Sequence, residues 1–118
     1  MRIRLYQDAR AYCFSLYDSK CGYCGVRTEF LHCDHIIPVS SGGSDNLDNM
    51  MPACPTCNGV KSNRDLDTFR EIISFHVQQA RLKSSAFRIC ERFNLISINE
   101  PEPIQFYFEY AKLAVEHG

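Results

Sequence analysis

The chain has 118 residues, of which 45% are hydrophobic and 23% charged, a composition typical of one small globular domain. This composition excludes a disordered or collagen-like chain, and no apolar run approaches the roughly 18 residues that span a membrane. The formal net charge of −1 does not indicate an overall basic nucleic-acid-binding protein, although basic side chains on one face could still bind phosphates.

The N-terminal half of the chain predicts a helix, a tight turn, a strand and a loop. Apolar residues recur at helical spacing over 3–18, which predicts an amphipathic helix. Residues 21–24 form a tight turn with glycines beside the cysteines, and residues 29–37 predict a short strand. The polar run over 40–46 is a loop by composition, and we expect Asp45 to shape it by bonding to local backbone.

The next part of the chain predicts a second strand and then helices. Residues 47–53 predict a strand, in which Pro52 lacks a ladder donor and favours a short or bulged pairing. A short helix over about 55–63 follows, since its first turn tolerates proline. Apolar spacing predicts further helices over about 66–82 and 85–94. The expected fold class is therefore α+β and mainly helical.

The segment 104–117 combines two patterns. Its first residues alternate as in a strand, whereas the apolar spacing that follows favours a helix, and we expect a helix. Its aromatic side chains could stack on bases, or they could form core or an interface with a partner. These side chains are Phe106, Tyr107, Phe108 and Tyr110.

The chain has seven cysteines, and four of them form the pairs Cys21–Cys24 and Cys54–Cys57. Two residues between thiolates let both reach one tetrahedral ion, so two such pairs close a four-sulfur zinc site with no open position. The alternatives are two redox pairs, which would require a βαβ pattern that the sequence lacks, and unrelated free thiols. We therefore expect a structural zinc that contributes to folding.

Cysteine number and the N-terminal sequence indicate the compartment. An odd number of cysteines argues against a disulfide framework, and the first residues contain no apolar signal-peptide core. We therefore expect a cytoplasmic protein. The remaining cysteines, Cys13, Cys33 and Cys90, are expected to be core or half-buried thiols.

A second set of polar residues lies within the span of the cysteine pairs. Asp34 and His35 are adjacent, and Asn58 directly follows Cys57. Closing the zinc site would bring Asp34 near Asn58, and their carboxylate and amide oxygens suit a hard cation such as Mg²⁺. His35 could accept a proton from water while the cation stabilises charge on a phosphate and its leaving oxygen. The pattern predicts phosphodiester hydrolysis.

The central segment resembles the HNH endonuclease motif in its zinc-stabilised ββα-metal form. The resemblance implies one HNH nuclease domain over 1–118, with an N-terminal helix over 1–20, the ββα-metal motif over 21–64 and a helical extension over 65–118. The matching positions are Cys21, Cys24, Asp34 to Pro38, Gly42, Gly43, Asn46, Leu47, Asn49, Cys54, Cys57, Asn58 and Lys61.

The resemblance implies a role for each matched polar side chain. His35 is the general base that activates water. Asp34 and Asn58 bind the catalytic divalent cation, Mg²⁺ or Mn²⁺. Asn49 holds the loop and orients the base. Lys61 corresponds to a basic residue that contacts phosphate.

We therefore expect a metal-dependent endonuclease that hydrolyses DNA, with RNA not excluded and no membrane partner. Lys61 and Arg64 are the residues most expected to contact phosphates. One alternative is a non-catalytic zinc-binding nucleic-acid or adaptor module, which the net charge of −1 weakly favours. Another is a nuclease subunit that relies for DNA binding on a protein partner or a homodimer formed through the C-terminal helices.

Overall fold

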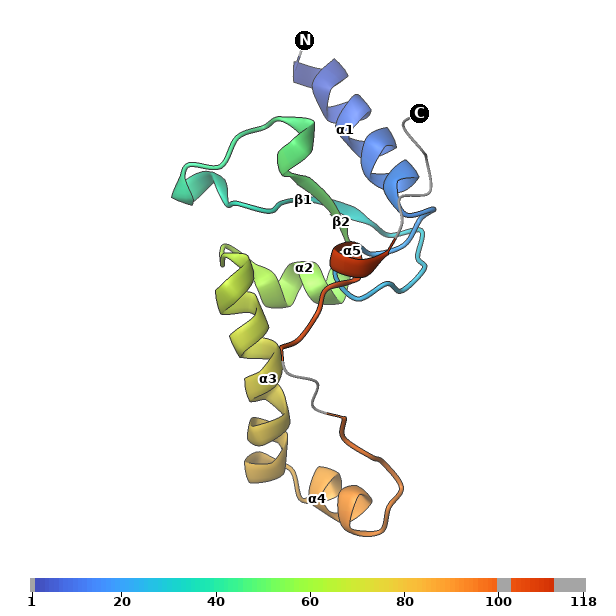
Figure 1. The fold of residues 1–118 in the computed structure, drawn as a ribbon, viewed down its shortest axis with the longest axis vertical. Coiled ribbons are helices and arrows are strands. Elements are labelled where there is room, and N and C mark those ends of the chain that lie inside the picture. The colour runs from blue at the N-terminus through green and yellow to red at the C-terminus, as the bar shows by residue number, and fades with distance from the viewer. Residues whose placement is uncertain (1, 100–102, 112–118) are drawn as a thin grey trace. The chain divides into compact units, whose positions relative to one another are not determined.

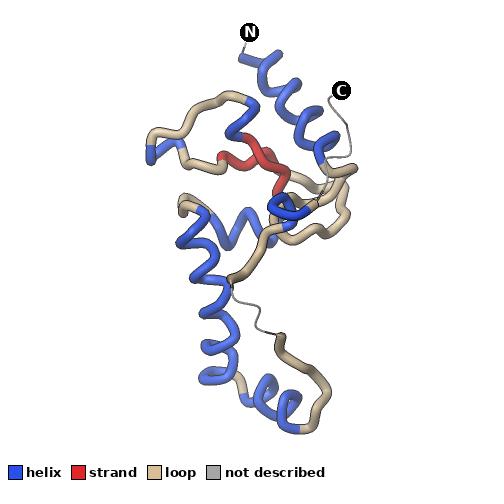
Figure 2. The backbone as a smooth tube through the Cα atoms, viewed as in Figure 1, coloured by secondary structure: helices blue, strands red, loops and turns tan. Residues whose placement is uncertain are grey.

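The computed structural model describes residues 2–99 and 103–111, with side chains described from residue 9 onward (Figure 1). Figure 2 shows one short two-stranded hairpin among the helices and loops of these residues. The mainly helical α+β class is therefore confirmed. The helices are α1 (Arg2–Leu16), α2 (Pro55–Lys61), α3 (Leu66–Lys83), α4 (Ser85–Arg92) and α5 (Tyr107–Tyr110), and the strands are β1 (His32–His35) and β2 (Met50–Ala53).

The chain divides into two compact units. Unit 1 comprises Met1–Leu66 and Gln105–Gly118, and unit 2 comprises Asp67–Ile104. All the candidate site residues lie in unit 1. A single domain over 1–118 stays a prediction. Within the described ranges, each helix is too short or too polar to cross a lipid bilayer.

An antiparallel hairpin lies at the centre of unit 1. β1 pairs with β2 so that Asp34 lies opposite Met51 and His35 opposite Met50. Both α1 and α2 pack against both strands, and Figure 1 shows these helices on different sides of the hairpin. Successive strand residues point to opposite faces. The hairpin therefore separates a face toward α1 from a face toward α2.

The face of the hairpin toward α1 carries an apolar core. Ala9 and Cys13 lie one helical turn apart on α1 and pack against Met50 of β2, joined by the partly buried Cys33 of β1. This arrangement agrees with the amphipathic helix predicted from the sequence. Because Cys33 faces α1, its neighbour Asp34 faces α2.

Both strands are shorter than the sequence predicts. The predicted strand over 29–37 is observed only as β1, because the Ile37 N–H donates to the side chain of Asn49 (2.9 Å) rather than to a strand. In the predicted strand over 47–53, Leu47–Asn49 form a 3₁₀ turn and only β2 pairs. Pro52 lies opposite Cys33 in a continuous register, so the strand is short but has no bulge.

Three helices after β2, namely α2, α3 and α4, agree with prediction to within two residues. α2 begins with Pro55, and the Cys54 sulfur caps it by accepting from the Cys57 N–H at 3.3 Å. In unit 2, Arg81 of α3 forms an ion pair with Glu91 of α4 at 2.7 Å. These local contacts explain why helix boundaries are readable from the sequence.

The predicted helix over 104–117 is wrong for its first residues. Residues 104–106 precede the helix, with Phe106 extended, and only α5 is helical, while residues 112–117 of the prediction lie outside the described residues. The N–H groups of Tyr107 and Phe108 donate to the carbonyls of Tyr23 and Gly22 at 2.9 and 2.8 Å. These bonds tie residues 105–111, the C-terminal strap, to the first cysteine turn.

Candidate functional site

Four cysteine sulfurs gather in unit 1. The Sγ atoms of Cys21, Cys24, Cys54 and Cys57 lie within 4.8 Å of one another, and those of Cys24 and Cys54 are 3.7 Å apart. Four thiolates around zinc, each at about 2.3 Å, would lie roughly 3.8 Å from each other. The cluster therefore fits a zinc ion bound by four sulfurs. Such a site leaves no open position for a substrate.

Hydrogen bonding favours negative charge on one of these sulfurs. The Cys57 thiol, followed by the backbone N–H groups of Cys24, Cys54 and Tyr23, lowers the pKa of Cys21 to about 4 against the opposing effect of burial. The same thiol–thiol bond raises the pKa of Cys57. Since zinc binds thiolates, the ionised Cys21 sulfur is a favourable first ligand.

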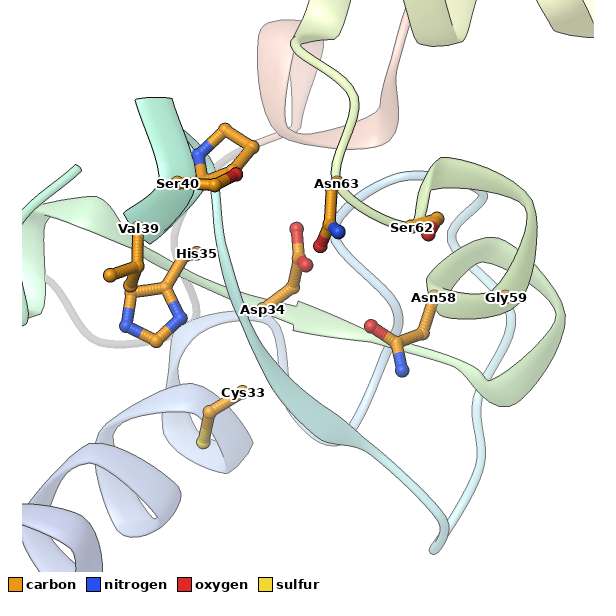
Figure 3. A pocket seen from close by; sticks show the side chains of 10 residues that line it. Cys33, Asp34, His35, Val39, Ser40, Asn58, Gly59, Ser62 and Asn63 are labelled. Carbon is orange, nitrogen blue, oxygen red and sulfur yellow. The ribbon is translucent and has the colours of Figure 1, made fainter. Parts of the chain in front are cut away.

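The sequence-predicted polar residues Asp34, His35 and Asn58 line one hollow between β1, the 3₁₀ turn Val39–Ser41 and α2. Figure 3 shows Asp34 and His35 on the strand and Asn58 on the helix, with Asn63 beside them. The hollow has a volume of about 460 Å³. Asp34, His35 and Asn58 all line this hollow, and Figure 3 shows the side chains of Asp34 and Asn58 on one side of the strand and the His35 imidazole on the other.

Asp34 is held by two buried donors. The Tyr23 hydroxyl donates to Asp34 Oδ2 at 2.6 Å, and the Lys61 ammonium lies 3.0 Å from the same oxygen. Both contacts fall on Oδ2, which leaves Oδ1 as the carboxylate oxygen for a ligand in the hollow. Together with the amide oxygen of Asn58, this donor set fits a hard divalent cation such as Mg²⁺ or Mn²⁺.

The prediction that Lys61 contacts phosphate is wrong for this structure. Its side chain is 0% exposed, and its ammonium donates to the carbonyl of His35 at 2.9 Å in addition to pairing with Asp34. A lysine on a short helix is usually solvated, so the sequence favours a surface role. Here Lys61 instead joins α2 to the end of β1 through Asp34 and the His35 carbonyl. Its role is to neutralise Asp34 and fix the strand end.

Replacement of Lys61 by methionine is expected to lower the free energy of unfolding by roughly 3–5 kcal/mol, because Asp34 would keep a buried charge without its ionic partner. Urea unfolding of the purified variant measures this loss. Lys83→Met at the exposed end of α3 is the matched control and should change the stability by about 0.5 kcal/mol or less. Equal stabilities for the two variants would contradict a structural role for Lys61.

His35 has an acidic partner that the sequence interpretation missed. Its Nε2 lies 2.9 Å from Asp45 Oδ1, and its side chain is 31% exposed. In neutral His35, an Nε2–H donated to Asp45 leaves Nδ1 with the lone pair that can accept a proton. The contact therefore orients the imidazole and favours the neutral tautomer whose Nδ1 carries the lone pair.

Asn49 closes the loop that connects the strands. Its side chain accepts from the Ile37 N–H at 2.9 Å and donates to the carbonyls of Ile37 and Ser44 at 3.1 and 2.8 Å. Gly43 lies so close that a Cβ there would collide with the Ile37 carbonyl. These contacts match the loop-holding role implied by the resemblance. An effect of Asn49 on the base stays a prediction.

Arg64 is exposed just after α2. One guanidinium nitrogen donates to the carbonyl of Val60 at 2.9 Å, where it satisfies part of the helix C-terminus. The side chain remains accessible to a ligand, unlike that of Lys61. Arg64 is thus the better candidate of the two for contact with a phosphate.

The strand–strand–helix order, the four-sulfur cluster and the hollow all fall within one continuous segment. Residues 21–64 match the family model of the HNH endonucleases. The match covers less than half of the chain and supports the HNH resemblance of this part, here called the HNH segment. It supports a nuclease-type or nucleic-acid-binding function with metal binding. A comparison with curated proteins gave no match.

Two residues of the HNH segment gain importance only from the structure. Tyr23 lies between the cysteines of the first pair, but nothing nearby in the sequence indicates that its hydroxyl reaches Asp34. Asp45 was expected to shape the loop, and its contact with His35 depends on how that loop folds back. An aromatic residue inside a cysteine turn is the one local signal that favours burial of Tyr23.

Proposed function

We propose that the protein is a metal-dependent endonuclease that hydrolyses phosphodiester bonds of DNA. The observation that carries the proposal is that Asp34, His35 and Asn58 all line one hollow of the HNH segment. A histidine beside two oxygen ligands supplies a base and a cation site in the same place. A purely structural zinc module has no need of this second group of polar residues.

In the proposed reaction, Asp34 Oδ1 and the Asn58 amide oxygen would hold the divalent cation, which would stabilise negative charge on the phosphate and on the leaving oxygen. Nδ1 of His35 accepts a proton from a water molecule, whose oxygen attacks phosphorus in line with the leaving oxygen. Asp45 contacts the other ring nitrogen, Nε2, and stabilises the imidazolium that forms when His35 takes up the proton. Arg64 is placed to bind a neighbouring phosphate.

Replacement of Asp45 by alanine is expected to lower kcat by about 10-fold, since a hydrogen bond to a charged group contributes about 1.5 kcal/mol or more. KM should stay unchanged, because Asp45 acts through His35 and does not bind the substrate. Steady-state cleavage of a labelled duplex measures both constants. Asp48→Ala, at a nearby exposed aspartate, is the control, and an equal effect of both variants would contradict the role of Asp45.

The experiment that tests the function is cleavage of a labelled DNA duplex by the zinc-loaded full chain. We expect product with Mg²⁺ or Mn²⁺ and none with chelator concentrations that spare the tightly bound zinc. DNA binding without cleavage under every metal condition would overturn the proposal and favour the non-catalytic zinc module.

A nuclease subunit that depends on a partner for DNA binding is the second candidate. Its support is the net charge of −1 together with large apolar side chains exposed on unit 2. Cleavage that requires very low salt would favour this candidate, because weak phosphate binding is the most sensitive to salt. The exposed side chains are Phe75, Leu82, Ile89, Phe93 and Leu95.

A further inference from the structure

Tyr23 is held by backbone and ring contacts, although the proposed reaction assigns it no role. It lies between two zinc-site cysteines and is 3% exposed. Its carbonyl accepts the N–H of Tyr107 in the C-terminal strap at 2.9 Å. Its ring meets those of Phe106 and Phe108 edge-on, with centroids 5.3 and 6.1 Å apart. These contacts restrict the Tyr23 side chain to few conformations.

The one polar atom of this fixed side chain points at a proposed metal ligand. The Tyr23 hydroxyl donates to Asp34 Oδ2 at 2.6 Å, a short bond typical of a charged acceptor. Lys61 occupies the same oxygen at 3.0 Å. With Oδ2 held from two directions, the carboxylate cannot rotate freely, and Oδ1 keeps one orientation at the hollow.

We propose that Tyr23 is a positioning residue that couples the zinc-bound cysteine turn to the cation ligand Asp34. The proposal rests on the proposed function, since it assumes that Asp34 binds a divalent cation. Partners that orient a metal ligand change metal affinity by about 10–100-fold in other proteins. The structural zinc therefore does more than stabilise the fold, because it fixes the turn that orients the second metal site.

The test is Mn²⁺ binding to the zinc-loaded full chain in the absence of substrate. Electron paramagnetic resonance measures the bound and free Mn²⁺. Tyr23→Phe keeps the ring and removes only the hydroxyl. We expect its Mn²⁺ dissociation constant to rise about 10-fold or more, with one zinc still bound per chain. Tyr17→Phe is the control, since this buried ring packs against Tyr107 and should leave Mn²⁺ binding unchanged.

A second variant covers the case in which Tyr23→Phe fails to fold. Phe106→Leu keeps the hydroxyl but removes a ring that supports Tyr23, and we expect Mn²⁺ affinity to fall by a smaller factor with zinc retained. Asn58→Ala should also weaken binding, which assigns the Mn²⁺ signal to this hollow. Unchanged or tighter Mn²⁺ binding by the folded Tyr23 and Phe106 variants would overturn the positioning role of Tyr23 but not the proposed nuclease function. Absence of Mn²⁺ binding by the wild type would overturn the proposed function as well.

Discussion

Replacement of Cys54 by serine, or removal of zinc by a strong chelator, is expected to unfold unit 1. Cys54 contributes a sulfur to the cluster and caps α2, while Cys21 and Cys24 bring the first turn to the same point. Structural zinc contributes about 10–16 kcal/mol of apparent binding free energy in small zinc domains, which matches or exceeds the whole stability of a typical domain. The apolar core that α1 forms with the strands is small, since its buried members are Ala9, Cys13 and Met50.

Circular dichroism during thermal unfolding measures this effect, with zinc content determined on the same samples. Cys90→Ser is the matched control, because Cys90 is half-buried in α4 and lies outside the four-sulfur cluster. Zinc should also be released as the pH falls, since protons compete with the metal for the thiolates. A zinc-free chain with an unchanged melting temperature would show that the cluster is not a structural metal site.

Replacement of His35 by alanine is expected to lower the rate of DNA cleavage by roughly 10²–10⁴-fold, the usual contribution of a general base. The fold should remain intact, because the imidazole is partly exposed and Lys61 binds the His35 carbonyl rather than its side chain. Single-turnover cleavage of a labelled duplex measures the chemical step. Zinc content and Mn²⁺ binding should stay close to those of the wild type.

His32→Ala is the control for this variant. His32 is exposed on the same strand and lies opposite Ala53, so its loss tests a general effect of removing a histidine from β1. We expect its cleavage rate to equal that of the wild type. A His35→Ala variant that cleaves as fast as His32→Ala would show that another group accepts the proton from water.

The sequence predicts the parts of this fold that depend on local spacing. Cysteines two residues apart report a metal-binding turn wherever the chain places them, so the four-sulfur cluster follows from spacing alone. The helix boundaries follow from apolar periodicity and Pro55, and the structure adds a cap at Ser84, whose hydroxyl accepts from the Phe87 N–H at 3.0 Å. The placement of Asp34 near Asn58 then follows from closing the cluster.

Contacts between distant residues could not be predicted in the same way. Lys61 has the same local pattern whether its ammonium meets solvent or Asp34, and only the packing of α2 on β1 decides between them. The alternation around Phe106 does mark an extended residue, but the chain there is bonded to the turn at Tyr23, far away in the sequence. A prediction from periodicity has no information about that partner.

The most direct test of the central claim is conversion of supercoiled plasmid to nicked or linear DNA by the purified, zinc-loaded chain. Wild type and His35→Ala are compared side by side with Mg²⁺, with Mn²⁺ and without added metal. We predict metal-dependent conversion by the wild type and at least 100-fold less by His35→Ala, as loss of a general base implies. Conversion by both proteins at one rate, or by neither with any metal, would contradict the assignment of this site as a nuclease centre.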